Sequence, residues 1–285
     1  MRLLKASPTA ERAEIYIRPG RESLALQARE FWRSRELLYF LVWKNLKVRY
    51  AQAILGVGWS LLQPILTASI MAFLLGRIAR FPTDGAPPFL FYLTGQVVWT
   101  FFASAVTTAA GSLVAHQQLI VKVYFTRLSL PIAGVLSAMV DLIVPFLLLM
   151  VVLIVYGRFD ISWEAVVALP LLLAIAAMTA TGLGVGLSAL NLQYRDVAHT
   201  LPFLVQTLFF ASPVIYSVSQ LPEKWRNVYF INPMAGVIDG MRAILLQTHP
   251  FSWGGVGVAL ASSIAILILG TLYFEKVEYR FADVA

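Results

Sequence analysis

Six long apolar stretches are the feature that most constrains the fold of this chain. They cover residues 50–76, 85–121, 128–157, 165–194, 197–222 and 243–274, and only Asp141 places a charge within any of them. A spanning helix needs about 20 apolar residues to cross the roughly 30 Å of hydrocarbon in a bilayer, and each stretch is longer than that. With 59% hydrophobic and 13% charged residues, the chain has too few polar side chains to cover six such segments in water. The sequence therefore predicts an all-α integral membrane protein.

The hydrophobic pattern predicts six transmembrane helices behind an N-terminal interfacial helix. We expect the spans near residues 56–78, 89–111, 131–156, 164–190, 200–218 and 252–273, within a transmembrane domain over 51–285. Residues 1–21 are polar and interrupted by prolines, so they are predicted as a cytoplasmic tail. Residues 22–50 place apolar side chains at helical spacing among basic ones, with tryptophans and a tyrosine suited to headgroup depth. This pattern predicts an amphipathic helix in the membrane interface, either as a simple anchor or as an element at the cytoplasmic mouth of a path.

The segment between the fifth and sixth spans predicts re-entrant helices. Residues 221–248 combine an apolar run with charges, prolines and glycines, and Asn232-Pro233 interrupts the run. Non-helical backbone at membrane depth is tolerated only where protein or a water-filled cavity surrounds it. We therefore expect two short helices that dip in from the outer side and meet near Asn232. An amphipathic surface loop is the alternative.

The positions of Lys and Arg predict the orientation of the chain. With six spans, 16 of the 22 Lys and Arg residues lie on the side that holds both termini. Basic residues favour cytoplasmic loops, so both termini of this multi-pass protein are expected in the cytoplasm, beneath the cytoplasmic (inner) membrane. The net charge of +7 then matches anionic membrane lipid and gives no reason to expect a nucleic-acid partner.

A search for catalytic and cofactor motifs excludes several functions. The phosphate-binding pattern G-x-x-x-x-G-K-[ST] does not occur, and Gly182 and Gly186 have the spacing that allows close helix packing. The chain has no cysteine and three scattered histidines, which argues against a metal site. Asp141, an ionisable residue within a span, is expected either to hydrogen-bond another helix or to line a path. We expect no catalytic residues.

Several aromatic residues near the ends of the predicted spans have two interpretations. Trp59, Trp99, Tyr216 and Tyr229 are examples. Aromatic faces stack on the apolar faces of sugar rings, which suits a conduit for a sliding glycan. The alternative is a pair of interfacial aromatic belts, which are common in membrane proteins.

Four short motifs in a fixed order carry a family resemblance. They are the segments 46–64, which reads LKVRYAQAILGVGWSLLQP, 119–128, which reads LIVKVYFTRL, and 194–196, which reads YRD, followed by the pair 212–216 and 232–234, which read SPVIY and NPM. Over about 240 residues the chain resembles the membrane permease of ABC exporters of polysaccharides and polyol phosphates, which include O-antigen, capsule and teichoic-acid exporters. Thr126 departs from the family pattern, in which proline is common, and this leaves the local turn in doubt.

The resemblance implies a transport subunit that has no catalytic site or cofactor of its own. It would form a homodimer with two separate ATPase subunits, which bind ATP and Mg. The complex would move a lipid-linked glycan, O-antigen-like or teichoic-acid-like, across the cytoplasmic membrane. Contacts with the ATPase would come from the residues His116, Gln118, Lys122, Tyr124, Arg127, Tyr194, Arg195 and Asp196.

The same resemblance assigns residues to a substrate path and gate. The cytoplasmic entrance would hold Phe31, Trp32 and Arg35, and the conduit would hold Trp59, Trp99 and Phe102. The outer gate would be bordered by Tyr216, Tyr229, Phe230 and Asn232.

Two other classes of membrane protein are alternatives to the ABC permease. A proton-coupled secondary transporter would need more ionisable groups near the midplane than Asp141, and a membrane-embedded glycan or lipid transferase would need clustered acidic residues.

Overall fold

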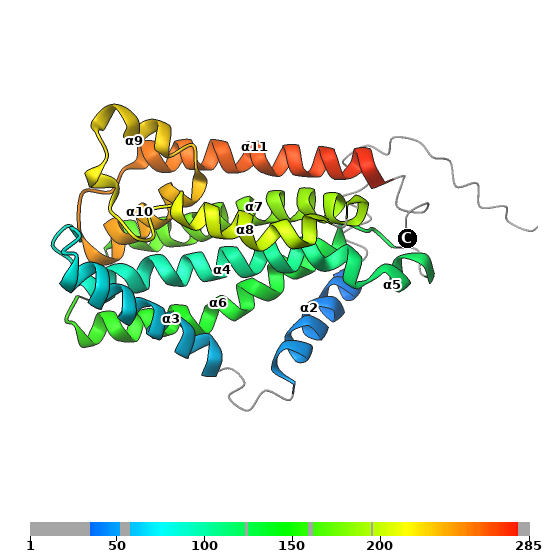
Figure 1. The fold of residues 1–285 in the computed structure, drawn as a ribbon, viewed down its shortest axis with the longest axis horizontal. Coiled ribbons are helices and arrows are strands. Elements are labelled where there is room, and N and C mark those ends of the chain that lie inside the picture. Colours follow the sequence, from blue (N-terminus) through cyan, green and yellow to red (C-terminus); the bar gives the residue numbers. More distant parts are fainter. Residues whose placement is uncertain (1–34, 52–57, 123–124, 159–161, 195, 279–285) are drawn as a thin grey trace, which may run out of the picture.

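The computed structural model describes residues 35–51, 58–122, 125–158, 162–194 and 196–278. Every regular element within these residues is a helix, which confirms the predicted all-α class. Five helices are long and apolar enough to cross a membrane: α3 with its π-helical continuation η1 (Gly58–Met71 and Ala72–Ile78), α4 (Pro88–Ala115), α6 (Ser129–Val155), α7 (Trp163–Gln193) and α11 (Trp253–Glu278). These five lie along the long axis of the molecule (Figure 1).

The fifth predicted span, near 200–218, differs from the expectation of one continuous membrane-length helix. Helix α8 (Asp196–Phe210) has 15 residues and is therefore about 22 Å long. The chain then turns through residues 211–216, where Ser212 and Pro213 are buried. Pro213 has no N–H for a helical bond and disfavours helical geometry at Ser212, which explains why the helix ends before it.

Short helices surround the long ones at both ends. They are α2 (Arg35–Tyr50), α5 (Gln117–Lys122), η2 (Val218–Gln220), α9 (Glu223–Tyr229) and α10 (Pro233–Leu246). Of the predicted interfacial helix over 22–50, the structure shows a helix from Arg35 onward, residues 22–34 lie outside the described part, and the interfacial position stays a prediction. The predicted break near Asn232 falls between α9 and α10, where the Asn232 side chain accepts a hydrogen bond from Met234 N at 3.1 Å and caps α10.

Small residues bring the long helices into close contact around α4. A Cβ at Gly134 of α6 would lie 2.9 Å from the backbone nitrogen of Ala109 in α4, and a Cβ at Gly182 of α7 would lie 2.6 Å from Leu267 Cα in α11. A Cβ at Gly270 would lie 2.0 Å from the Gly182 carbonyl oxygen. These contacts assign Gly182 the packing role predicted from its spacing. Helix α4 itself is largely buried, and several of its side chains line the cavity described below.

The two ends of the bundle carry different elements. Helices α2 and α5 and the end of α11 lie at one end, and α9, α10 and the loop before α4 lie at the other (Figure 1). We call these the α5 end and the α9 end. The predicted ATPase contacts and the predicted outer gate therefore lie at opposite ends of the molecule.

Candidate functional site

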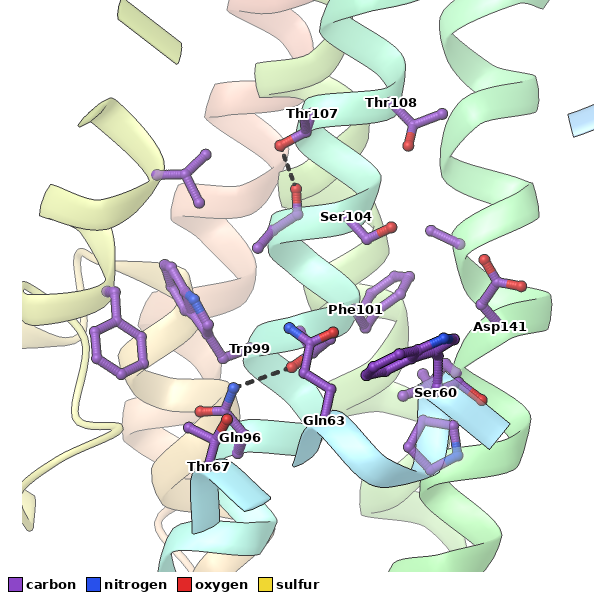
Figure 2. A pocket seen from close by; sticks show the side chains of 18 of the residues that line it. Ser60, Gln63, Thr67, Gln96, Trp99, Phe101, Ser104, Thr107, Thr108 and Asp141 are labelled. Atoms are coloured by element: carbon purple, nitrogen blue, oxygen red, sulfur yellow. Dashed lines mark hydrogen bonds between the residues drawn. The ribbon is translucent and has the colours of Figure 1, made fainter. Parts of the chain in front are cut away.

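A cavity of about 830 Å³ lies between α3, α4, α6 and α8, with the end of α2 at one edge. Figure 2 shows Ser60, Gln63 and Thr67 of α3 facing the labelled side chains of α4 across it, with Asp141 of α6 beside them. The predicted path residues Trp59 and Trp99 both line this cavity. The structure thus brings together two path residues that stand 40 positions apart in the sequence.

Helical periodicity explains why so much of the lining is polar. Gln96, Thr100, Ser104 and Thr108 follow one another at intervals of four residues on α4, so they share one face. Ser60, Gln63 and Thr67 form a second stripe on α3 at intervals of three and four. The remaining faces of both helices are mainly apolar, which keeps the polar groups on the cavity side.

Aromatic rings form the other part of the lining. The side chain of Trp59 is 55% exposed, whereas Trp99 is 5% exposed and meets Phe209 of α8 nearly edge-on, with ring centroids 5.5 Å apart. Phe102, which was also expected in the path, does not line the cavity. It is buried in the core and packs against Trp99, with the two ring centroids 5.2 Å apart.

An ion pair lies at the edge of the cavity next to α2. Arg49 of α2 pairs with the Asp141 carboxylate, and Tyr50 donates a hydrogen bond to the same carboxylate at 2.8 Å. The Arg49 guanidinium also donates to Thr108 at 3.2 Å. Asp141 therefore fits both expectations: it bonds residues of another helix, and it lines the cavity. Its partner is a cation, which sequence reasoning did not anticipate.

The predicted gate residues connect the end of α8 to α9 and α10. The hydroxyl oxygens of Tyr216 and Tyr229 are 2.7 Å apart, and Tyr229 also donates to the Ala211 carbonyl at 3.0 Å. Asn232 Nδ2 donates to the same carbonyl at 3.0 Å. Phe230 is instead buried against α11, where its ring lies within 3.0 Å of the position that a Cβ on Gly255 would take. Three of the four gate residues thus share one hydrogen-bonded cluster.

Arg242 of α10 anchors the non-helical segment that follows α8. Its guanidinium donates to the carbonyls of Pro213, Tyr216 and Val214 at 2.5, 3.1 and 2.8 Å, and its Nε donates to Phe91 at 3.3 Å. Backbone carbonyls outside a helix need partners when they are buried, and one guanidinium supplies donors to several of them. Arg242 is one of the six Lys and Arg residues that the orientation argument counts on the outer side, and its side chain is buried.

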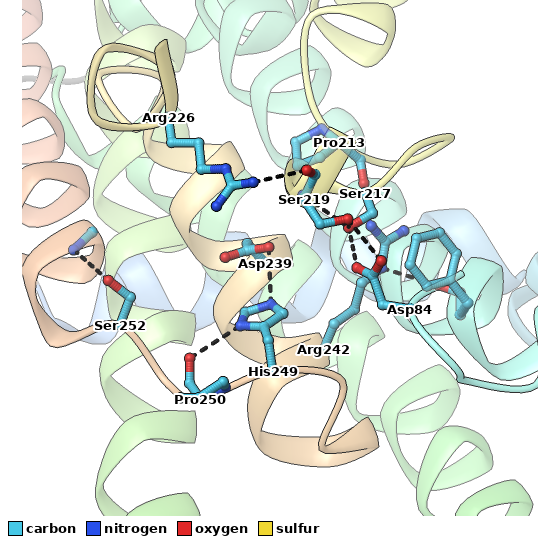
Figure 3. A network of polar contacts seen from close by, with 12 residues as sticks. Asp84, Pro213, Ser217, Ser219, Arg226, Asp239, Arg242, His249, Pro250 and Ser252 are labelled. Atoms are coloured by element: carbon cyan, nitrogen blue, oxygen red, sulfur yellow. Dashed lines mark hydrogen bonds and ion pairs between the residues drawn. The ribbon is translucent and has the colours of Figure 1, made fainter. Parts of the chain in front are cut away.

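Two acidic residues complete this polar network (Figure 3). Asp84, in the loop before α4, accepts hydrogen bonds from Ser217 and Ser219 and so holds the end of the same segment. Asp239 of α10 lies 3.2 Å from His249 Nε2. The Nδ1 atom of His249 is 3.0 Å from the Pro250 carbonyl. A histidine that donates with both nitrogens is protonated, so the hydrogen bond to Asp239 raises the pKa of His249 above its usual value despite opposing desolvation.

The predicted ATPase contacts divide into exposed and internally bonded residues. Gln118, Lys122, Tyr194 and Asp196 are exposed at the α5 end. His116 hydrogen-bonds Lys44 of α2 at 3.1 Å, and Arg127 donates to the Glu278 carbonyl of α11 at 2.7 Å. These two residues therefore tie α4–α5 and α5–α6 to neighbouring helices. Arg35 begins α2 and is exposed. The predicted residues Phe31, Trp32, Tyr124 and Arg195 lie outside the described residues.

Similarity to known proteins identifies the family of this chain. Residues 36–246 match the ABC-2 type transporter family. The chain belongs to that family. This member is 29% identical over 250 residues to the O-antigen export system permease protein RfbA of Klebsiella pneumoniae, covering 87% of this chain and 95% of the relative. It is 29% identical over 258 residues to the RfbA permease of Myxococcus xanthus, covering 90% and 97%. It is 23% identical over 246 residues to the polysialic acid transport protein KpsM of Escherichia coli, covering 85% and 92%.

The matched region contains all the residues that line the cavity and most of the polar network. Sequence reasoning missed three residues there: Arg49, Arg242 and Asp84. Arg49 and Asp141 are 92 positions apart, so no local spacing connects them. For Arg242 a signal existed, because an arginine within the apolar run of residues 228–246 needs buried acceptors, and the predicted non-helical backbone supplies them.

Proposed function

We propose that this chain is the membrane permease of an ABC exporter that moves a lipid-linked polysaccharide, O-antigen-like or teichoic-acid-like, across the cytoplasmic membrane. The observation that carries the proposal is the cavity, whose lining alternates amide and hydroxyl groups with indole rings within a member of the ABC-2 family. Amides and hydroxyls exchange hydrogen bonds with sugar hydroxyls, and indoles stack on sugar rings. The export permeases among the relatives support the same substrate class.

The permease would act as a homodimer. Gln63 of α3 and Gln206 of α8 are exposed on helices at the membrane-facing side of the cavity. A polar side chain is costly against lipid, and such residues face a bundle interior or water. A second copy packed against α3 and α8 would cover both amides and complete the wall of a shared conduit. In this proposal α8 and the turn after it form the sixth pass, because their combined length reaches the α9 end.

Energy would come from two separate ATPase subunits that bind ATP and Mg. Helix α5, with exposed Gln118 and Lys122, would dock in the ATPase, and Tyr194 and Asp196 would make a second contact. The internal bonds of His116 and Arg127 would pass a displacement of α5 to α2 and α11. The hydrogen-bonded cluster of Tyr216, Tyr229 and Asn232 would form the outer gate.

Photocrosslinking in the assembled transporter tests this proposal. A photoreactive phenylalanine analogue is placed at Trp59 or Trp99, and transport is stalled with an ATPase subunit that binds ATP without hydrolysing it. We expect both positions to capture lipid-linked glycan, whereas the exposed position Leu147 on α6 serves as a control and captures only lipid. Equal capture of glycan at all three positions would contradict a path through the cavity.

A further inference from the structure

The charges that line the cavity cancel one another. Among the described lining residues, Arg49 and Asp141 are the charged ones, and they pair with each other. Every other polar lining group is an amide, a hydroxyl or an indole. The cation that an anionic ligand would meet among these residues is Arg49, and a carboxylate already balances its charge. The Arg49 side chain is 34% exposed, so an anion that reached it would lie beside the Asp141 carboxylate and meet a charge that is already neutralised.

One buried group in the cavity specifies the kind of hydrogen-bonding partner it needs. Gln96 is 6% exposed, and its Nε2 donates to Thr100 at 3.2 Å. Its Oε1 finds no hydrogen-bond partner among the residues that the structure describes. Figure 2 shows this side chain beside Trp99 and opposite Thr67 of α3. A buried acceptor without a donor is destabilising, so the site is complementary to a ligand that brings hydroxyl donors.

The hydroxyl groups around Arg49 are also arranged as acceptors. Thr108 and Ser104 accept from the guanidinium at 3.2 and 3.5 Å. Thr107 donates its own proton to the Ala103 carbonyl at 2.7 Å, which leaves its lone pairs for a ligand. Ionised carboxylates and phosphates offer acceptors alone, so they could accept the hydroxyl protons of Ser104 and Thr108 but would have no proton to donate to the Gln96 oxygen. An uncharged sugar offers a donor at every hydroxyl.

From the balanced charges and the unpartnered Gln96 oxygen, we propose that this cavity takes an uncharged, hydroxyl-rich stretch of glycan and discriminates against a polyanionic one. The inference rests on the proposed export function and narrows its substrate class to an uncharged, O-antigen-like glycan, because a teichoic-acid-like polymer carries phosphates along its length. The Arg49–Asp141 pair has a selective role in this proposal, because Asp141 keeps Arg49 from acting as a binding site for anions. Each carboxylate or phosphate that entered would be desolvated without a counter-charge, which is costly in a low-dielectric site.

A matched pair of probes tests the proposal. One is the tetramer of α1,4-linked galacturonic acid, and the other is its carboxyl-reduced product, the galactose tetramer, so the two differ only in four carboxylates. A benzophenone-bearing phenylalanine analogue replaces Phe209, which lines the cavity, in the full chain reconstituted in lipid nanodiscs with its ATPase. We expect the galactose tetramer to be captured at least tenfold more efficiently than the galacturonate tetramer.

Charge variants identify the cause of that preference. Asp141→Asn frees the Arg49 charge, and we expect it to raise galacturonate capture at least fivefold while galactose capture changes less than twofold. Glu164→Gln removes the same charge from an exposed position at the start of α7, away from the cavity, and should change neither probe. Gln96→Leu removes the buried acceptor and should lower galactose capture severalfold.

The outcomes separate this inference from the export proposal. Equal or stronger capture of galacturonate by the chain that carries only the Phe209 analogue would overturn the preference for uncharged glycan while leaving the export proposal intact. Capture of neither probe at Phe209, together with no glycan at Trp59 or Trp99 in the stalled transporter, would overturn both. If Asp141→Asn fails to assemble, the comparison of the two probes on the chain that carries only the Phe209 analogue still tests the preference for uncharged glycan.

Discussion

At the residue scale, two arginines, Arg49 exposed at the edge of the cavity and Arg242 buried, show two ways in which this chain accommodates charge. Arg49 is balanced by a carboxylate, whereas Arg242 is surrounded by backbone carbonyls and the face of Phe91, whose ring centroid is 3.5 Å from the guanidinium carbon. The first arrangement leaves the charge at the edge of a cavity, and the second uses it to fix a non-helical segment. The same residue type thus lines the cavity in one place and fixes a non-helical segment in the other.

Replacing Arg242 should destabilise the α9 end. Arg242→Gln removes donors from the buried carbonyls of residues 213, 214 and 216, and we expect a loss of about 3 kcal/mol of stability. Arg158→Gln is the matched control, because Arg158 is exposed and its bonds to Leu246 and Gly85 measure 3.3 and 3.4 Å. Thermal unfolding in detergent measures both variants. A fall in Tm that is no larger for Arg242→Gln than for Arg158→Gln would contradict the anchoring role.

The raised pKa of His249 predicts a pH dependence of stability. Because the folded pKa lies above the unfolded value of about 6.5, the stabilisation is fully present below pH 6.5 and is lost as pH rises through the folded pKa. The Tm difference between the unsubstituted protein and His249→Gln should therefore shrink as pH rises from 5.5 to 8.5. His199→Gln, at an exposed position of α8, is the control and should show a constant difference. A difference that grows with pH would contradict the His249–Asp239 bond.

At the element scale, hydrophobic pattern predicted the long helices better than the short ones. An apolar run of 20 or more residues has one stable solution in a bilayer, so α4, α6, α7 and α11 could be located to within a few residues from sequence. Pro213 is a local signal for the end of α8, but it lies in an equally apolar run, and the buried partner that stabilises the turn, Arg242, lies some 30 positions later. Local pattern carries no information on such a partner. The same limit applies to Arg49 and Asp141, whereas the polar stripe of α4 was present in the sequence and can be read from its four-residue spacing.

Helix α5 gives the prediction that belongs to this scale. Lys122 is exposed at its end, so Lys122→Glu should weaken association with the ATPase at least fivefold without affecting membrane insertion. Lys224→Glu makes the same change at an exposed position of α9, at the opposite end, and should leave association unchanged. Copurification of the ATPase measures both. Arg127 is excluded from this test because its bond to the Glu278 carbonyl supports the fold. Normal copurification with Lys122→Glu would remove this residue from the docking surface.

At the scale of the whole molecule, the arrangement of charge and of gate residues supports one direction of transport. The α5 end carries the exposed residues proposed to meet the ATPase, and the α9 end carries the tyrosine cluster, with the cavity between them. An exporter driven by cytoplasmic ATPases requires the α5 end to face the cytoplasm. The excess of Lys and Arg in the segments on that side favours the same orientation.

Cysteine labelling tests this orientation directly, because the chain has no cysteine of its own and each introduced thiol is unique. Gln118→Cys in α5 and Lys224→Cys in α9 place thiols at exposed positions of the two ends. In intact cells, a membrane-impermeant maleimide should label position 224 and leave position 118 unlabelled until the membrane is opened. A short helix α8 that returned to the side where it began would instead put both positions on one side. Labelling of both in intact cells, or of neither, would therefore contradict the six-pass arrangement, and with it the cytoplasmic docking of α5.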